Sequence, residues 1–156
     1  MFSAKHTGSD IEAHDWFGFS VSLHDEIALV GASQQSDGGA AYVFVQNETD
    51  GSWTQTQKIT ANDGENSNGF GYSVSVYDEM LVVGANSDDY SGTASGAAYV
   101  FEQDSTGEWV QIAKLVASDG NDGGTLGVSV ELDVDILFVG ALSDSETGAA
   151  YVFPTD

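Results

Sequence analysis

Apolar and polar residues alternate strictly at three places along this chain. Residues 19–23 read Phe-Ser-Val-Ser-Leu, residues 72–76 read Tyr-Ser-Val-Ser-Val, and residues 128–132 read Val-Ser-Val-Glu-Leu. A period of two directs successive side chains to opposite faces of an extended chain. Each of these segments is therefore predicted to be a β-strand whose two faces differ.

A short, continuously apolar run follows each alternating segment after a tight acidic turn. The runs are Ile27–Val30, Met80–Val83 and Ile136–Val139. Runs of this length between turns suit strands that are covered on both faces. Each run is therefore predicted to be the second strand of its unit.

The pentapeptide Ala-Ala-Tyr-Val-Phe comes next in each unit and is predicted to be the third strand. It occurs at residues 40–44, 97–101 and 149–153. A polar, threonine-rich segment over residues 53–60 suits a fourth, outer strand next to water. The pattern thus predicts four strands in each unit.

Three copies of one unit make up nearly the whole sequence. Corresponding positions include the pairs Phe17-Gly18, Phe70-Gly71 and Leu126-Gly127, and the lysines Lys5, Lys58 and Lys114. A period of about 50 residues, rich in apolar runs and glycine turns, is typical of stacked or radial β architectures. No segment has helical periodicity, so the predicted class is all-β.

Four-stranded antiparallel units, apolar in the middle and polar outside, describe the blades of a β-propeller. The whole chain, residues 1–156, is predicted to be a single propeller segment. Its parts are a displaced outer strand at residues 1–7 and blades at residues 8–57, 58–113 and 114–156. Gly31, Gly84 and Gly140 end the second strands, where the chain turns sharply or a neighbouring sheet approaches closely.

The Phe-Gly pairs before the first strand and the Gly-Ala pairs after the second resemble FG-GAP repeats, the blades of the integrin α-subunit propeller. The likeness is closer to the bacterial branch, with Ala-Ser-Asp-Gly, Phe-Gly-x-Ser-Val-Ser, Val-Val-Gly-Ala and Ala-Tyr-Val-Phe, and it covers residues 5–153. The resemblance implies a noncatalytic, extracellular or cell-surface propeller that binds partners through loops on one face. Related propellers include adhesion receptors, fungal lectins and accessory domains of secreted enzymes.

Integrin-type blades often carry an acidic calcium loop between their first and second strands, and this chain departs from that pattern. The connection is a tight turn in all three units. Asp133 and Asp135 alone supply too few oxygens for calcium, which takes roughly six to eight. The usual calcium site of the family is therefore expected to be absent, although calcium stays the candidate cofactor for other loops.

The N-terminal segment is displaced relative to the repeat. Aligning Lys5 with Lys58 sets residues 1–7 on residues 54–60, the fourth-strand position that the third unit lacks. Three blades do not close, because propellers need about four to eight, and a lone chain would expose two apolar blade faces. The favoured partner is therefore the protein itself, in a homodimer with a six-bladed ring in which each displaced strand completes the last blade of the other chain. A larger ring and an excised piece of a longer propeller stay open.

The charge of the chain excludes several classes of partner. It has 25 acidic residues, three lysines and no arginine, for a formal charge of −22. Nucleic acid and anionic membranes require cationic side chains, so neither is an expected partner. Acidic excess on a folded chain fits solubility, adaptation to salty surroundings or cation binding. No apolar run approaches the roughly 20 residues that span a bilayer, so no membrane insertion is expected.

Aspartates before the Phe-Gly positions are the candidate metal ligands. They are Asp10, Asp63 and Asp119, with Glu65 and Asp122 as further oxygen donors nearby. A structural turn is the simpler interpretation of these residues. The three lysines at one repeat position are interpreted as structural ion pairs with blade carboxylates.

The loops between the second and third strands carry the candidate ligand-binding residues. They are Asp37, Asp88, Asp89, Tyr90, Asp144 and Glu146. Acidic and aromatic groups on exposed loops bind sugars and peptides in other proteins, although solvated loop residues are the simpler interpretation.

No catalytic constellation is evident in the sequence. No serine lies in a Gly-x-Ser-x-Gly elbow, and His6, His14 and His24 share no spacing. The sequence therefore predicts a binding or adhesion scaffold rather than an enzyme, with a glycan or an extracellular protein as candidate partner. The alternatives are a lectin, a noncatalytic piece of a larger secreted enzyme, and a propeller fragment or engineered assembly unit without a ligand of its own.

Overall fold

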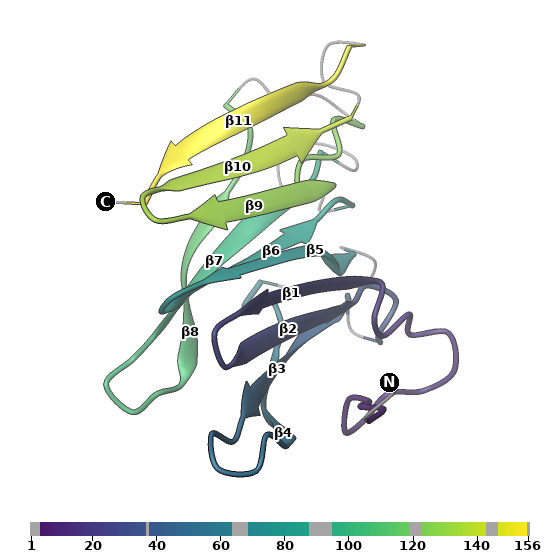
Figure 1. The fold of residues 1–156 in the computed structure, drawn as a ribbon. Helices are drawn as coiled ribbons and strands as arrows, with labels where there is room; N and C mark the ends of the chain where they lie inside the picture. Colours follow the sequence, from purple (N-terminus) through teal and green to yellow (C-terminus); the bar gives the residue numbers. More distant parts are fainter. Residues whose placement is uncertain are drawn as a thin grey trace.

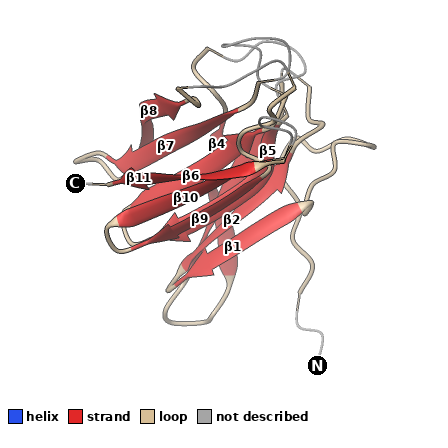
Figure 2. Cartoon of the chain, turned by 90° about the horizontal axis from the view of Figure 1, so that it is seen from above, coloured by secondary structure: helices blue, strands red, loops and turns tan. Residues whose placement is uncertain are grey.

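The computed structural model describes residues 4–36, 38–63, 69–87, 95–118, 123–142 and 147–155. These residues form eleven β-strands and no helix, which confirms the all-β prediction. Figure 2 shows strands joined only by loops. The described part of the chain accordingly contains no helix that could cross a membrane.

The strands form three antiparallel sheets, one for each repeat. The first sheet has the order β1 (Ser20–His24), β2 (Ile27–Ala32), β3 (Ala40–Gln46), β4 (Trp53–Ile59). The second has the order β5 (Phe70–Tyr77), β6 (Met80–Ala85), β7 (Ala97–Gln103), β8 (Trp109–Leu115). The third contains β9 (Ser129–Asp133), β10 (Ile136–Ala141) and β11 (Ala149–Pro154). Consecutive strands are neighbours, so each sheet is an antiparallel meander of the kind found in propeller blades.

The prediction of four strands per unit holds for the first two sheets but not for the third. Among the described residues, β11 pairs only with β10, and residues 4–7 of the predicted displaced strand lie outside the strands. Figure 1 shows the reason: the N-terminal segment lies beside the first sheet, whereas β11 lies at the far end of the stack. The single chain therefore has no outer strand beside β11 within its described part.

The second sheet lies between the first and the third (Figure 1). Its strand β5 contacts β1 and β2 on one side and β9 on the other. One buried apolar cluster, which includes Leu29, Val43 and Phe70, joins the first two sheets. A second cluster, which includes Val82 and Val130, joins the second and third sheets. The core therefore consists of layers between sheets packed face to face.

Serines at the polar positions of the alternating strands connect neighbouring sheets. Ser20 Oγ donates to the carbonyl oxygen of Gly71 at 2.9 Å, and Ser73 Oγ donates to that of Gly127 at 2.7 Å. The polar positions of the sequence pattern are thus used in contacts between sheets.

The next serine in each strand accepts a hydrogen bond across the same interface. The backbone N–H of Val76 donates to Ser22 Oγ at 3.1 Å, and that of Leu132 donates to Ser75 Oγ at 3.0 Å. The contact between the first two sheets is therefore repeated between the second and third, residue for residue.

Glycine is required where the sheets approach most closely. A Cβ atom at Gly31 would collide with the carbonyl oxygen of Gly71, and one at Gly84 would collide with that of Gly127. The close approach predicted at the ends of the second strands is therefore confirmed for these two glycines.

Candidate functional site

The strand order divides the loops between two ends of the sheets. The β1–β2 hairpin and its equivalents lie at one end, together with the β3–β4 and β7–β8 loops; we call this the hairpin end. We call the opposite end of the sheets the loop end. It is where the second strand of each sheet is joined to the third, through the β2–β3, β6–β7 and β10–β11 connections, and where the chain enters β1, β5 and β9. The candidate ligand-binding residues and the candidate metal ligands Asp63, Glu65, Asp119 and Asp122 belong to connections whose flanking strands meet at the loop end, and Asp10 belongs to the segment that enters β1.

Most of these candidates lie outside the described residues. They are the ligand-binding candidates Asp37, Asp88, Asp89, Tyr90, Asp144 and Glu146 and the metal candidates Glu65, Asp119 and Asp122. Their roles remain predictions. Asp10 and Asp63 are described, and both lie in the same arrangement.

Asp10 is held by two side chains of the first sheet. Lys58 Nζ on β4 lies 2.6 Å from Asp10 Oδ2, and the Tyr42 hydroxyl on β3 donates to Oδ1 at 2.8 Å. Hydrogen bonds from Lys58 and Tyr42 hold the pKa of Asp10 below its ordinary value. Burial, together with the Asp10 carboxylate, raises the pKa of Tyr42, whose ring and hydroxyl are buried. Asp10 thereby ties the segment that enters β1 to the strands β3 and β4 of its sheet.

The same arrangement recurs at Asp63 in the second sheet. Lys114 Nζ lies 2.7 Å from Asp63 Oδ2 and 5.2 Å from the centroid of the Tyr99 ring. Burial by itself raises the pKa of Asp63, but hydrogen bonds from Lys114 and Tyr99 outweigh it and leave the pKa below its ordinary value. The structural ion pairs predicted for Lys58 and Lys114 are therefore confirmed.

We call this arrangement a clamp and define it as the set Asp10, Lys58 and Tyr42 in the first sheet and the set Asp63, Lys114 and Tyr99 in the second. Each clamp aspartate already has a lysine ammonium as its partner, so a metal ion binding there would displace that cation. Within the described ranges, no three His, Asp or Glu side chains are grouped so that they could hold a metal ion together. The role of the clamps is structural: they fix the segments that enter the first and second sheets at the loop end.

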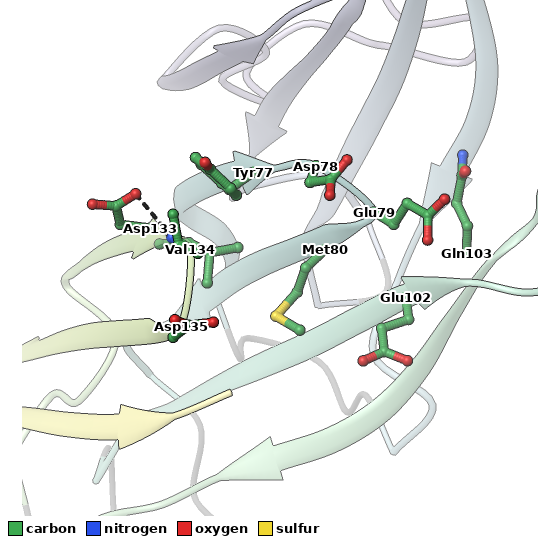
Figure 3. A pocket seen from close by; sticks show the side chains of 10 residues that line it. Tyr77, Asp78, Glu79, Met80, Glu102, Gln103, Asp133, Val134 and Asp135 are labelled. Atoms are coloured by element: carbon green, nitrogen blue, oxygen red, sulfur yellow. Dashed lines mark hydrogen bonds between the residues drawn. The ribbon is translucent and has the colours of Figure 1, made fainter. Parts of the chain in front are cut away.

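An acidic hollow lies at the hairpin end, between the second and third sheets. It has a volume of about 530 Å³, and its lining carries five carboxylates, from Asp78, Glu79, Glu102, Asp133 and Asp135. Figure 3 shows these side chains spread around the hollow, with Asp133 accepting a hydrogen bond from the Val134 N–H at 2.8 Å. Sequence reasoning missed this hollow, although the acidic turns that line it recur in every unit. Its charge favours cationic or hydroxyl-bearing groups over anions.

An apolar hollow of about 330 Å³ lies on the side of the first sheet that faces away from the second. Phe17, Val21, Val30, Phe44 and Trp53 line most of it, together with His6, Gly18 and Ala28. The His6 ring lies against that of Phe44, with 6.1 Å between the centroids. No Asp, Glu, Lys or Arg side chain is among the residues that line this hollow.

The chain matches a known protein family along most of its length. A family model described as FG-GAP repeat matches residues 1–44, 53–101 and 109–153. The three matched segments end at the third strands of the three sheets. No curated protein sequence matches the chain significantly.

Proposed function

Because the chain belongs to the FG-GAP repeat family, we propose that it is a noncatalytic binding scaffold of the propeller type that holds its ligand with the loops of the loop end. The observation that supports this proposal is that serines and lysines at recurring positions make structural contacts and are not available to a ligand. The serines of β1 and β5 bind the next sheet, and the lysines of β4 and β8 hold the clamps. The connections between the second and third strands differ in sequence between the units, and we assign ligand binding to these loops.

The charge of the chain narrows the class of ligand. A net charge of −22 repels anionic ligands and attracts cationic ones. Neutral carbohydrates and basic peptides therefore fit better than sulfated or phosphorylated ligands. A lectin is the second candidate, supported by the sequence of one loop in which Tyr90 follows Asp88 and Asp89, because an aromatic face beside carboxylates suits a sugar ring with hydroxyl groups.

The proposal includes an extracellular or cell-surface location, which rests on the resemblance to adhesion propellers alone. A chain that acts there meets carbohydrates and protein surfaces rather than metabolites. The ligand classes to test follow from this location and from the charge.

The test is binding of the purified chain to arrays of neutral glycans, sulfated glycans and basic peptides. Tyr90→Ala and Asp89→Asn alter the loop end, and Glu48→Gln alters an exposed carboxylate at the hairpin end as the matched control. We expect the two loop variants to weaken binding to the neutral or basic probes at least tenfold, while Glu48→Gln binds as the parent does. Equal binding by all four proteins, or a preference for sulfated glycans, contradicts the proposal. If the chain hydrolyses a generic ester or glycoside, and a single loop substitution abolishes this activity, the proposal that the scaffold is noncatalytic is contradicted.

A further inference from the structure

Two faces of the chain are apolar and exposed, one at each end of the stack of sheets. The first-sheet face is the side of β1–β4 that faces away from the second sheet, and it includes Val21 and Leu23. The third-sheet face is the side of β9–β11 that faces away from the second sheet, and it includes Ile136, Phe138 and Val152. Soluble proteins rarely leave such contiguous apolar patches uncovered.

The repeat indicates what would cover the first-sheet face. The corresponding faces of the second and third sheets are buried, each against the sheet that precedes it in the chain. Val21 is 68% exposed, whereas Val74 and Val130 at the same position are each 8% exposed. Leu23 is 64% exposed, and its counterparts Val76 and Leu132 are buried. In both buried cases the covering group is the sheet that precedes in the chain.

The third-sheet face shows the converse. Phe138 is 45% exposed, whereas Leu29 and Val82 at the same position are fully buried against the sheet that follows. Val152 is likewise exposed, and its counterparts Val43 and Val100 are buried. The third-sheet face therefore corresponds to the faces with which the first sheet covers the second and the second sheet covers the third.

The glycine of each Phe-Gly pair gives independent support at the level of the backbone. Gly18, Gly71 and Gly127 have nearly the same φ, +87°, +90° and +88°. A Cβ atom at Gly71 or Gly127 would meet the carbonyl oxygen of Ala40 or Ala97 from the preceding sheet, whereas nothing lies within 4 Å of that position at Gly18. Gly18 thus has the conformation of an interface glycine without the partner backbone.

The apolar hollow lies on the first-sheet face, at a position where the second sheet is covered by side chains of the sheet that precedes it. At the second sheet the equivalent surface, around Phe70 and Phe101, packs with Leu29 and Val43 in one cluster. On the third-sheet face these two covering positions are occupied by Phe138 and Val152, which are exposed. The side chains that would fill the hollow are therefore carried by the chain itself, at its opposite end.

We propose that the third-sheet face of one copy covers the first-sheet face of a second copy, and that two such contacts close a ring of six sheets. The occupant is a second copy because its surface continues an interface that already occurs twice within the chain. A ring of two copies satisfies both faces of both chains at once and has twofold symmetry. Six sheets fall within the roughly four to eight that propellers contain. This inference does not depend on the ligand proposed above.

The same contact brings a residue of the partner copy to an incomplete part of the third sheet. The first two sheets have an outer strand with a clamp lysine, Lys58 or Lys114, and the third has no outer strand among the described residues. Lys5 holds the equivalent position in the aligned repeat and forms no ion pair within the described chain. In the ring, the segment that contains Ala4 and Lys5 runs beside β11 of the other copy.

The test is light scattering of the full chain after size exclusion in about 1 M sodium chloride, where screening shortens the Debye length to about 3 Å. The expected mass is twice that of the 16.3 kDa chain. Phe138→Lys and Val21→Lys each alter one of the two faces and are expected to reduce the mass to that of one chain. Because each added lysine makes the chain less negative, dissociation of the dimer cannot result from stronger charge repulsion between the two copies. Ile112→Lys is the matched control: Ile112 is exposed on β8, and Thr56 at the same position stays exposed beside a neighbouring sheet.

Mixing the two variants separates a head-to-tail contact from a contact of one face with itself. The Phe138→Lys chain retains an intact first-sheet face, and the Val21→Lys chain retains an intact third-sheet face, so the mixture is expected to recover dimers with one unaltered contact. Circular dichroism of each variant should match the parent, since both positions are exposed in the single chain. A monomeric parent, a mass that increases steadily with concentration, or one variant that stays dimeric alone overturns the proposal.

Discussion

The Asp10 carboxylate has two functions in the first clamp. It neutralises Lys58 at the surface and accepts the hydrogen bond of a tyrosine hydroxyl that water does not reach. The two functions differ in cost, because an exposed ion pair contributes about 0–1 kcal/mol, whereas an unsatisfied buried hydroxyl costs about 1–3 kcal/mol.

Two substitutions at this position therefore separate charge from hydrogen bonding. Asp10→Asn retains an acceptor for Tyr42, and we expect it to reduce the free energy of unfolding by less than about 1 kcal/mol. Asp10→Ala removes the acceptor as well and should reduce it by about 1–3 kcal/mol. Urea denaturation measures both values, and equal losses for the two variants would contradict the role given to Tyr42.

The lowered pKa values of Asp10 and Asp63 predict how stability depends on pH. A carboxyl group whose pKa is lower in the folded protein stabilises it above the ordinary unfolded pKa, near 4, and loses this contribution as the pH falls through the folded value. We expect the free energy of unfolding to decrease between about pH 5 and pH 3. The decrease should be smaller in the Asp10→Asn, Asp63→Asn double variant.

We expect the double variant to retain part of the pH dependence, because Asp50 and Asp104 also have lowered pKa values. Their carboxylates accept hydrogen bonds from Ser52 and Thr106 in turns at the hairpin end. A double variant with the same slope as the parent would show that the clamps do not contribute.

At the scale of strands and sheets, the sequence pattern predicted the four strand types of the repeat and their order. The alternating segments correspond to β1, β5 and β9, and the Ala-Ala-Tyr-Val-Phe segments begin β3, β7 and β11. These elements were predictable because period and turn residues are local properties. The use of the serines was not predictable, because a serine facing water and one facing the next sheet produce the same alternation.

The serine contacts give a prediction for the interface between sheets. Ser73→Ala removes the 2.7 Å hydrogen bond to the Gly127 carbonyl in a buried position, so we expect the free energy of unfolding to decrease by about 1 kcal/mol or more. Ser105→Ala, at an exposed turn position, is the control and should change it by less than about 0.5 kcal/mol. Similar values for the two variants in denaturant titrations would show that the interface does not depend on this bond.

Candidate sites were less predictable than strands. The ion pairs of Lys58 and Lys114 followed from a shared repeat position, but the sequence did not identify Asp10 and Asp63 as their partners. Those partners come from segments about 50 residues away in the chain, and only the stacking of β-strands brings them together. The apolar hollow was equally hidden, because the residues that line it are those expected of any blade core.

At the scale of the whole molecule, the net charge of −22 opposes the compact fold. We expect the melting temperature to increase with sodium chloride, since screening weakens repulsion among the carboxylates. Thermal melts over a range of salt concentrations measure this effect, and a melting temperature independent of salt contradicts it. Matched calcium and magnesium chloride series form the control, because a far larger increase with calcium at equal ionic strength would indicate specific sites instead.

The arrangement of the whole assembly is tested most directly by a disulfide between copies. Within the chain, Ser22 Oγ lies 3.1 Å from the backbone nitrogen of Val76, and the equivalent positions on the two exposed faces are Glu131 and Leu23. The chain has no cysteine, so Glu131→Cys with Leu23→Cys introduces the only thiols, and a disulfide forms only when two Cα atoms lie within about 4.4–6.8 Å.

Oxidised double-cysteine protein, denatured and analysed without reductant, should migrate as a discrete dimer with both thiols consumed. Leu23→Cys with Ile112→Cys should remain monomeric under the same conditions. A discrete dimer that reductant separates is the result that a closed ring of two head-to-tail copies predicts. Free thiols on a monomer, or a ladder of ever larger linked species, would contradict it.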